Sequence, residues 1–466
     1  MKRRDGIVNV LDGEKYTPYG LARKLSAKVI LESSSIERGR ARYSLIMVRE
    51  AFRLIQRGGT IHIEVDGKRK RIKGNGKDIL DYLPYFANQH PVFEKDIPVP
   101  AGGIGYLSYE FAGNCDNIRF RRKEDEIGLP LGAFLFGHVF IVFDHYTDRI
   151  YLIGLNYREH EIDLENAIKA AERRIHDLDF NYLSREEEQH SVEILDGEDE
   201  RIVFLDGVKR IKDEIIKGNL LQGVLSRRMK IKTELPAFAA YKLLRSTNPT
   251  PYLFYLDFGE YQLFGSSPEV HIKVSDGKVL IRPLAGTRRR GTNMEEDISL
   301  ERELLADEKE KAEHLMLVDL ARNDLGRFCV AGSVKVTDFM GIERFSHLMH
   351  IVSQVEGELS PEKSGIEAIR ATFPAGTVSG APKIRSIEVV DNLERYTRGF
   401  YAGLVGYLGS DGNLDTCITI RSAIKKGDEL YLQAGAGVVY DSVPEREYEE
   451  TGEKLRALAA AVGVEI

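Results

Sequence analysis

Hydrophobic and polar residues alternate along the first part of the chain in a way that predicts strands mixed with helices. Residues 133–144 and 149–155 are predicted strands that flank a turn at residues 145–148, which is typical of a strand hairpin. Residues 162–178 then show apolar positions three and four apart, which predicts an amphipathic helix.

The pattern becomes denser from residue 202 onward. A helix is predicted over residues 204–217, and it ends at Gly218, a residue that favours helix termination. Predicted strands follow at residues 222–232, 252–257, 261–266, 270–274 and 279–283. Hairpins combined with long helices predict an α+β fold rather than a repeating βαβ array.

One charged stretch, residues 184–200, has almost no apolar run and is the best candidate for a linker. It suggests an N-terminal part over residues 1–190 and a C-terminal part over residues 201–466. A chain of 466 residues suits two large domains or one composite domain.

Composition narrows the function classes. A net charge of −7 and a pI near 6.0 disfavour a nucleic-acid platform. No stretch has signal-peptide character or membrane-spanning length. The three cysteines lack metal-ligand spacing and suit a reducing compartment, so we expect a soluble cytoplasmic protein.

Two pairs of glutamates are the first candidates for chemistry. Glu310 with Glu313, and Glu447 with Glu450, have i, i+3 spacing that places both carboxylates on one helix face. The first pair lies in a helical pattern over residues 298–325. Carboxylate oxygens suit Mg²⁺, although solvated helix faces are the commoner explanation for either pair alone.

The second pair has a glycine-rich segment before it and a lysine after it. Ser442 and Glu445 have capping-box spacing, so Ser442 is the predicted helix N-cap. Lys454 lies one turn beyond Glu450, where it could meet a substrate carboxylate or form an ordinary ion pair with Glu450. The backbone at Gly435, Ala436 and Gly437 could approach an anion, or could simply turn from a strand to a helix.

A series of motifs in the C-terminal part carries a family resemblance. Read in order, they are Gln222-Gly223-Val224-Leu225-Ser226-Arg227-Arg228, Gly265-Ser266-Ser267-Pro268-Glu269, Pro283-Leu284-Ala285-Gly286-Thr287, Glu313-His314-Leu315-Met316-Leu317-Val318-Asp319-Leu320-Ala321-Arg322-Asn323-Asp324, His347-Leu348-Met349-His350, Phe373-Pro374-Ala375-Gly376-Thr377 and Asp415-Thr416-Cys417-Ile418-Thr419-Ile420-Arg421. This series resembles the chorismate-utilising enzymes, and most closely anthranilate synthase component I. The resemblance implies an α+β fold in which two β-sheets pack as a sandwich with helices outside and the active site in a central cleft.

The resemblance also implies a role for each matched residue. Glu269 would protonate the leaving ring hydroxyl, and His350 would help to complete pyruvate elimination. Thr377 would contact the substrate, as would Ala285, Gly286 and Thr287. Arg421, with Tyr401 as its hydroxyl partner, would bind the enolpyruvyl carboxylate, and Gly435, Ala436, Gly437 and Lys454 would complete the substrate site.

Simpler roles remain open for several of these residues. Glu269 could be a surface carboxylate after a turn, His350 a core or capping histidine, and Thr377 part of a turn.

By resemblance, Glu310, Glu313, Glu447 and Glu450 would hold Mg²⁺ as the cofactor, with Glu313 and Glu450 as the direct ligands.

Two residues select among the sister reactions. Isochorismate and salicylate synthases carry a lysine at the position of Gln222, where it activates water; a glutamine cannot act as that base. Aminodeoxychorismate synthases typically carry a nucleophilic lysine at the position of Ala285. Both residues favour conversion of chorismate and ammonia to anthranilate and pyruvate, the first committed step of tryptophan biosynthesis.

The ammonia source and the regulation are also implied. None of the cysteines lies in a Gly-x-Cys-x-Gly nucleophile elbow, so we expect a separate glutamine amidotransferase subunit as partner, anthranilate synthase component II. The family's segments for inhibitory tryptophan match Leu31, Glu32, Ser33, Asn248, Pro249, Pro251 and Tyr252. As strand-end and turn residues, these positions also have a purely structural explanation.

Two alternatives to anthranilate synthesis stay open. The chain could be aminodeoxychorismate synthase component I of the folate pathway, or a catalytically silent amino-acid sensor or scaffold. The presence of Glu269, His350, Arg421 and all four glutamates disfavours a catalytically silent sensor or scaffold. Tryptophan is absent from the chain, as would suit an enzyme made during tryptophan starvation.

Overall fold

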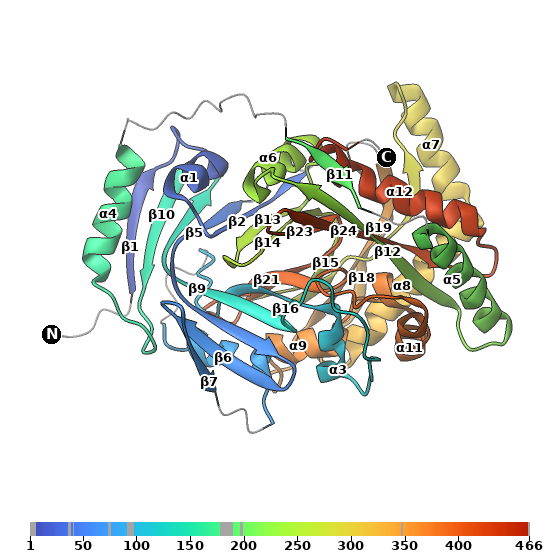
Figure 1. Cartoon of the computed structure of the whole chain (residues 1–466), viewed down its shortest axis with the longest axis horizontal. Coiled ribbons are helices and arrows are strands. Elements are labelled where there is room, and N and C mark those ends of the chain that lie inside the picture. The colour runs from blue at the N-terminus through green and yellow to red at the C-terminus, as the bar shows by residue number, and fades with distance from the viewer. Residues whose placement is uncertain are drawn as a thin grey trace.

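The computed structural model describes residues 6–35, 39–40, 42–72, 76–90, 97–177, 190–195, 199–345 and 348–464. It confirms the α+β prediction, because all the described strands except the β3–β4 pair join into one large sheet network, and helices lie around its outside (Figure 1). Every ladder between the described strands is antiparallel. This pairing fits the hairpins that the alternation predicts.

The N-terminal part contributes long paired strands. Its strands are β1 Gly6–Asp12, β2 Val29–Glu32, β3 Ser34–Ser35, β4 Gly39–Arg40, β5 Tyr43–Arg57, β6 Thr60–Val65, β7 Lys68–Ile72, β8 Ile104–Leu107, β9 Gly132–Asp144 and β10 Arg149–Leu155. Its α-helices are α1 Pro18–Leu25, α2 Leu83–Ala87, α3 Ala112–Cys115 and α4 Leu164–His176. The predicted hairpin is therefore β9–β10, and the predicted helix over residues 162–178 is α4.

The C-terminal part adds shorter strands and longer helices. Its strands are β11 Val192–Ile194, β12 Gln222–Thr233, β13 Tyr252–Asp257, β14 Gln262–Ser267, β15 Val270–Ser275, β16 Lys278–Ile281, β17 Leu284–Arg289, β18 Lys335–Arg344, β19 Leu348–Glu358, β20 Gly380–Ala381, β21 Leu404–Leu408, β22 Leu414–Ile418, β23 Ser422–Lys426 and β24 Glu429–Val438. Its helices are α5 Asp199–Ile216, α6 Ala237–Thr247, α7 Met294–Ala306, α8 Glu308–Gly326, α9 Gly365–Thr372, α10 Gly376–Ser379, α11 Lys383–Leu393 and α12 Pro444–Ala460.

Strands of the two parts pair with one another. β2 lies between β5 of the N-terminal part and β13 of the C-terminal part. β8 in the same way joins β9 to β21. The division at residues 190 and 201 therefore crosses a continuous hydrogen-bonded network, and the assignment of two parts stays a prediction.

The strands separate two hydrophobic clusters. In β10, Ile150 and Leu152 pack into one cluster while Tyr151, Ile153 and Leu155 pack into the other. Successive side chains of a strand point to opposite faces, so a strand buried on both faces feeds both clusters. α1 and α4 cover the cluster on one side of these strands (Figure 1).

The predicted linker over residues 184–200 is partly wrong. Residues 184–189 and 196–198 lie outside the described residues. Val192–Ile194 form β11, which pairs with β12, and α5 already starts at Asp199. The charged side chains suggested a linker, but strand pairing depends on the backbone, and the backbone groups of β11 form hydrogen bonds with β12.

Two helix predictions also need correction. The single pattern over residues 298–325 is broken at Asp307, whose carboxylate accepts hydrogen bonds from Lys309 and Glu310 and caps α8. At α12 the N-cap is Val443, not Ser442. Ser442 Oγ instead accepts a hydrogen bond from the Val439 backbone, which tightens the turn before the helix.

Candidate functional site

A cavity of about 560 Å³ lies between the strands and helices of the C-terminal part. Its walls come from segments far apart in the sequence: the start of β12, the β14–β15 turn, β17, α8, β19, α10, β24 and α12. The cavity is lined by the predicted residues Gln222, Glu269, Ala285, Gly286, Thr287, Glu310, Glu313, His350, Thr377, Tyr401, Arg421, Gly435, Gly437, Glu447, Glu450 and Lys454. The antiparallel ladders thus bring together motifs that span more than 230 residues.

Glu269 is buried at the floor of this cavity. It follows β14 in the turn to β15, and burial raises the pKa of its carboxyl to about 8. The nearby hydroxyl of Thr377 and the charge of Lys454 oppose this rise in pKa only in part. Glu269 is therefore mostly protonated at neutral pH and can donate a proton.

His350 lies on β19 opposite β17. Its Nδ1 is 3.0 Å from the Thr287 hydroxyl. Burial, and then the charge of Arg421, lower the pKa of His350 to about 3, so the ring is neutral. Gly286 forms a bulge in β17 with φ +81°, a conformation that glycine adopts without strain.

Gln222 connects the strand wall to the helix wall. Its side-chain amide donates a 2.8 Å hydrogen bond to Glu313 on α8. Burial, and then the charges of Glu310 and Glu450, raise the pKa of Glu313 to about 7. The pKa of Glu447 is also raised, first by burial. Carboxylates from α8 and α12 thus repel each other across one cavity.

Cations already meet two of these four glutamates. Arg288 Nη1 lies 3.1 Å from Glu310, and Lys454 Nζ lies 2.6 Å from Glu450. Lys454 also donates a 2.9 Å hydrogen bond to the Gly435 carbonyl. Within the described residues, no three acidic, histidine or cysteine side chains stand close enough together to form a ready metal site. Of the two roles considered for Lys454 from the sequence, the structure shows the ion pair with Glu450.

Gly435 and Gly437 lie inside β24 and not in a loop, which corrects the expected anion loop. A Cβ atom at Gly435 would lie 2.7 Å from the Tyr401 hydroxyl, and one at Gly437 would lie 2.7 Å from Gln222 Nε2. Glycine at these positions leaves room for the side chains of Tyr401 and Gln222. Ala436 points the other way, into a hydrophobic cluster, so its side chain is not part of the site.

Arg421 lines the cavity and has an unusual backbone conformation. Its φ of 51° is uncommon for a residue with a side chain, and such outliers cluster at functional sites. The guanidinium is buried, which lowers its pKa, and its Nη1 donates a 3.3 Å hydrogen bond to the Lys454 carbonyl. The Tyr401 hydroxyl lies beside it, and the Gly435 backbone binds that hydroxyl.

Sequence reasoning missed several cavity residues. Arg288 and Lys309 line the site, as do Ser442 and Arg446. Arg288 belongs to a run of three arginines that immediately follows Thr287, and this adjacency was the available signal. Acidic residues that follow this run in the sequence form ion pairs with it in the structure, as Asp307 and Glu310 do with Arg288.

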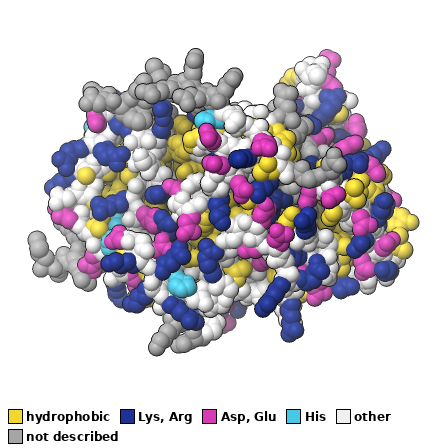
Figure 2. All heavy atoms as spheres, viewed as in Figure 1, with side chains coloured by type: hydrophobic (Ala, Val, Ile, Leu, Met, Phe, Trp, Pro, Cys, Tyr) yellow, Lys and Arg dark blue, Asp and Glu magenta, His cyan; other side chains and the backbone are white. Residues whose placement is uncertain are grey.

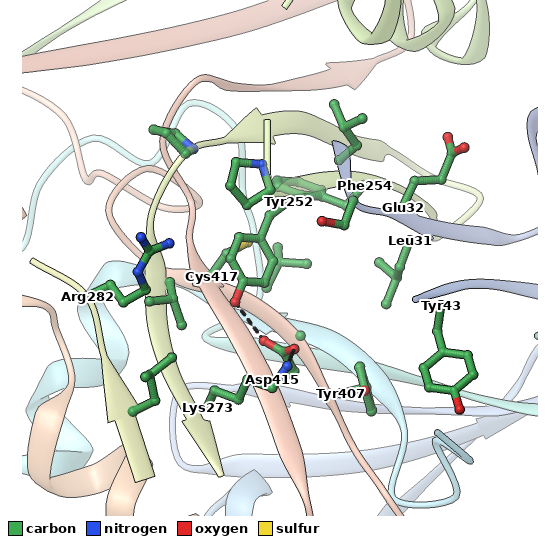
Figure 3. A pocket seen from close by; sticks show the side chains of 18 of the residues that line it. Leu31, Glu32, Tyr43, Tyr252, Phe254, Lys273, Arg282, Tyr407, Asp415 and Cys417 are labelled. Atoms are coloured by element: carbon green, nitrogen blue, oxygen red, sulfur yellow. Dashed lines mark hydrogen bonds and ion pairs between the residues drawn. The ribbon is translucent and has the colours of Figure 1, made fainter. Parts of the chain in front are cut away.

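A second cavity of about 590 Å³ lies on the other side of the β14–β15 turn. Leu31, Glu32 and Ser33 from the end of β2 line it together with Pro251 and Tyr252. Sequence reasoning missed its polar wall, formed by Lys273, Arg282, Glu343 and Asp415. Figure 3 shows the ring of Tyr252 reaching toward Asp415, to which its hydroxyl donates a 2.8 Å hydrogen bond.

The predicted tryptophan set is only partly gathered in this cavity. Asn248 and Pro249 do not line it, and Asn248 bonds Ser266 instead. The Glu32 carboxylate turns out of the group in Figure 3 and is held by Arg245 at 2.6 Å and by Tyr241 at 2.8 Å. Glu32 therefore fixes the end of β2 against α6.

Comparisons with known proteins agree with this geometry. Residues 50–460 match the family model described as chorismate binding enzyme. Anthranilate synthase component 1 of Spirochaeta aurantia is 58% identical over 462 residues, which cover 99% of this chain and 96% of the relative. The Aquifex aeolicus protein of the same name is 37% identical over 96% of this chain and 92% of its own length.

Solved structures give the same grouping. The crystal structure of anthranilate synthase component I from Streptococcus pneumoniae TIGR4 superimposes with a TM-score of 0.81 at 36% identity, covering 90% of this chain and 92% of that one. The isochorismate synthase MenF from Escherichia coli has a TM-score of 0.74 at 20% identity, over 98% and 94% of the two chains, and shares the fold. No helix in the described parts of the chain is both long and apolar enough to cross a membrane. The chain belongs to the chorismate-binding enzyme family and groups there with the anthranilate synthase component 1 proteins.

Proposed function

We propose that this chain is the large subunit of an anthranilate synthase that converts chorismate and ammonia to anthranilate, pyruvate and water. Ammonia would add at ring carbon 2 while the hydroxyl on carbon 4 leaves with a proton. The enolpyruvyl ether would then break, the ring would lose the proton from carbon 2, and the released enolpyruvate would take up a proton to become pyruvate.

The observation that carries this proposal is the surroundings of Glu269. Its carboxyl has a pKa near 8 and shares one cavity with Gln222 and Ala285. A protonated acid meets the need of a poor leaving group. Neither Gln222 nor Ala285 offers the lysine that would activate water or attack the ring, and this supports ammonia as the nucleophile.

His350, Arg421 and Tyr401 would hold the substrate around that acid. Arg421 is a buried guanidinium beside the Tyr401 hydroxyl, a pair suited to a carboxylate. Neutral His350 can accept a proton as the pyruvate leaves, with Thr287 orienting the ring through Nδ1. This assembly would be superfluous in a silent sensor.

The glutamates of α8 and α12 fit Mg²⁺ as the cofactor. Glu310, Glu313, Glu447 and Glu450 line the cavity, and burial together with the charges of Glu310 and Glu450 raises the pKa of Glu313. A divalent cation would relieve that repulsion once Arg288 and Lys454 release two of the carboxylates. The bound ion would supply positive charge for the ring carboxylate of chorismate.

A fluorescence assay tests the reaction. The purified chain is supplied with chorismate, an ammonium salt and Mg²⁺, and anthranilate is identified by its emission and its mass. Anthranilate as the product supports the proposal. Aminodeoxychorismate or salicylate as the product, or no Mg²⁺-dependent turnover, would overturn it.

The nitrogen of glutamine would come through a separate amidotransferase subunit. The chain has no nucleophile elbow of its own, and its three cysteines are free. Both subunits would work in the reducing cytoplasm, which suits such thiols. Glutamine-dependent activity should appear only on mixing the two proteins, and activity from glutamine by this chain alone would refute the partnership.

Tryptophan would bind in the second cavity and inhibit. Leu31, Ser33 and Tyr252 offer apolar and hydroxyl surface there. Pro268 and Leu284 line both cavities, so a ligand in one can displace the wall of the other. A tryptophan titration that changes neither the rate nor the affinity for chorismate would refute this regulation.

A further inference from the structure

A small cavity of about 30 Å³ adjoins the substrate cavity. Glu269, Leu317 and Thr377 line both, so the proposed acid stands where the two cavities meet. We call the smaller one the side cavity. A cavity of this size holds about one or two water molecules when its walls offer polar partners. The side cavity is therefore a water-sized connection between Glu269 and the other polar groups on its walls.

The wall beside Glu269 has free hydrogen-bonding capacity. Within the described residues, the buried Thr377 hydroxyl of α10 makes no hydrogen bond, yet it lies close enough to lower the pKa of the Glu269 carboxyl. Buried hydroxyls normally have a partner, and a water that bridges Thr377 and Glu269 would supply one. This part of the side cavity is thus suited to water in contact with the acid.

His271 of β15 also lines the side cavity, but both of its ring nitrogens already have partners. Its Nδ1 lies 3.2 Å from the Thr416 hydroxyl, and its Nε2 lies 3.2 Å from the Thr372 hydroxyl. Burial lowers the pKa of His271 to about 3, so the ring stays neutral and takes up no proton from solvent. His271 therefore shapes the wall.

Asp324, near the end of α8, is the other ionisable group on these walls besides Glu269 and His271. Its side chain is 11% exposed, and Lys383 Nζ at the start of α11 lies 2.9 Å from its Oδ2. The same ammonium donates a 3.2 Å hydrogen bond to the Thr372 carbonyl, which holds the pair at the cavity wall. Burial raises the pKa of Asp324, and Lys383 opposes that rise.

Asp324 also lies near the outer surface. Charged side chains of both signs are interspersed over the face of the molecule in Figure 2, and the outer approach to Asp324 has the same mixed character. Arg327 is 49% exposed and Asp116 is 29% exposed, with 3.9 Å between their charged atoms, and both charges act on the Asp324 carboxyl. Asp324 thus stands between solvent and the side cavity.

Glu269 has a need that the substrate cavity does not meet. After it protonates the leaving hydroxyl it is a carboxylate, and it must regain a proton before the next turnover. Bound substrate and products fill the substrate cavity and exclude water from it. A separate path to solvent would serve the acid while that cavity is occupied.

We propose that water in the side cavity returns a proton from Asp324 to Glu269 after each turnover. This inference rests on the proposed function, in which Glu269 is the acid. Asp324 acts through Glu269 and does not touch the substrate.

The protons balance. Glu269 gives its proton to the hydroxyl as the bond from ring carbon 4 to oxygen breaks, and water leaves. A solvent proton then binds Asp324, water in the side cavity protonates Glu269, and that water regains a proton from Asp324. Asp324 is ionised before and after, so one solvent proton is consumed. The proton that the added ammonia loses at ring carbon 2 goes to solvent and restores the balance.

The test uses the full chain with chorismate, an ammonium salt and Mg²⁺. Asp324→Asn keeps the size of the side chain and an acceptor for Lys383 but binds no relayed proton. Ala321→Val fills the side cavity without changing charge, because Ala321 of α8 also lines it. Asp319→Asn is the matched control on the same helix, since the Asp319 side chain is 56% exposed and pairs with Arg322.

Rapid mixing separates the first turnover from the steady state, in H₂O and in D₂O. Glu269 starts protonated at neutral pH, so both test variants should complete the first turnover within about twofold of the wild-type rate. Their steady-state rate should then fall about tenfold or more and show a larger solvent isotope effect. Asp319→Asn should match wild type in both phases.

Two results would overturn the inference. One is a steady-state rate within about twofold of wild type in both test variants. The other is a first turnover slowed as much as the steady state, because a merely structural change damages both phases alike. Should Asp324→Asn unfold, Ala321→Val alone decides. The proposed function fails separately, if the wild-type chain makes no anthranilate from ammonium in either phase.

Discussion

Gln222 and Glu313 form a 2.8 Å hydrogen bond that joins the start of β12 to α8. One residue belongs to the motif that selects the nucleophile, and the other to the group proposed to hold Mg²⁺. The amide donates, so it favours the ionised form of Glu313 and opposes the rise in pKa that burial causes. The residue proposed to select the nucleophile and the group proposed to hold Mg²⁺ are therefore physically linked, and several predictions depend on this link.

Replacement of Gln222 by lysine should abolish ammonia-dependent anthranilate formation. The ammonium group would form an ion pair with Glu313 in a buried site and occupy a carboxylate that Mg²⁺ needs. We expect kcat/KM to fall at least about 100-fold. Gln222→Met is the control, because it fills the same space without a charge. Equal losses in both variants would show that the amide itself, and not the added charge, matters.

Glu269→Gln should reduce kcat by about 10² to 10⁴, since the amide cannot protonate the leaving hydroxyl. In the wild type the rate should fall as the pH passes about 8, the pKa to which burial raises this carboxyl. The pH profile of kcat checks this. A rate that stays constant from pH 6 to 10 would exclude Glu269 as the acid.

The same pKa makes a prediction about stability. A carboxyl with a raised pKa binds its proton more tightly in the folded state, so its contribution to stability is lost as the pH rises from the unfolded value through about 8. The Glu269→Gln variant has no titrating carboxyl at this position, so it does not lose this contribution as the pH rises. Urea unfolding should therefore show the variant gaining stability over wild type, by up to a few kcal/mol, at pH 8.5 compared with pH 5.

Glu313→Gln should raise the Mg²⁺ concentration needed for half-maximal activity about tenfold or more, because a charged ligand is lost. In the wild type, the apparent Mg²⁺ affinity should increase from pH 6 to pH 8, as Glu313 with its pKa near 7 loses its proton. Glu308→Gln on the first turn of α8 is the control, since Glu308 is 86% exposed. Its Mg²⁺ titration should match wild type.

Gly437→Ala should disturb the Gln222–Glu313 bond directly. The added Cβ would lie 2.7 Å from Gln222 Nε2, so the amide must move. We expect kcat/KM for chorismate to fall about tenfold with little change in melting temperature, because a flexible side chain absorbs the clash. Gly326→Ala at the end of α8 meets nothing within 4 Å and should behave as wild type.

Glu394→Gln should destabilise the fold. Glu394 is buried, holds Arg398 at 2.8 Å and accepts hydrogen bonds from the Ser226 amide and hydroxyl on β12. Breaking a buried pair leaves an uncompensated charge and costs about 3 to 5 kcal/mol in the free energy of unfolding. Asp319→Asn removes an exposed pair with Arg322 and should cost less than about 0.5 kcal/mol. Similar losses in the two variants would contradict the role of burial.

The sequence by itself determined the elements and the identity of most site residues. Short apolar runs bounded by turn residues located β9, β10, β12 and β13 to within a residue or two at each end, because strand and turn preferences are local. The ordered motifs indicated Glu269 and His350 as candidates, and the i, i+3 spacing indicated the four glutamates; all six line one cavity.

Only the tertiary structure decided what these residues meet. The tertiary structure directs the Ala436 side chain into the core, since the direction of a side chain in β24 depends on the ladder with β12. It pairs Arg288 with Glu310 and Lys454 with Glu450, and it buries Glu269 enough to raise the pKa of its carboxyl. Periodicity describes a few neighbouring residues, whereas burial, charge pairing and a shared cavity depend on strands and helices that meet across hundreds of residues.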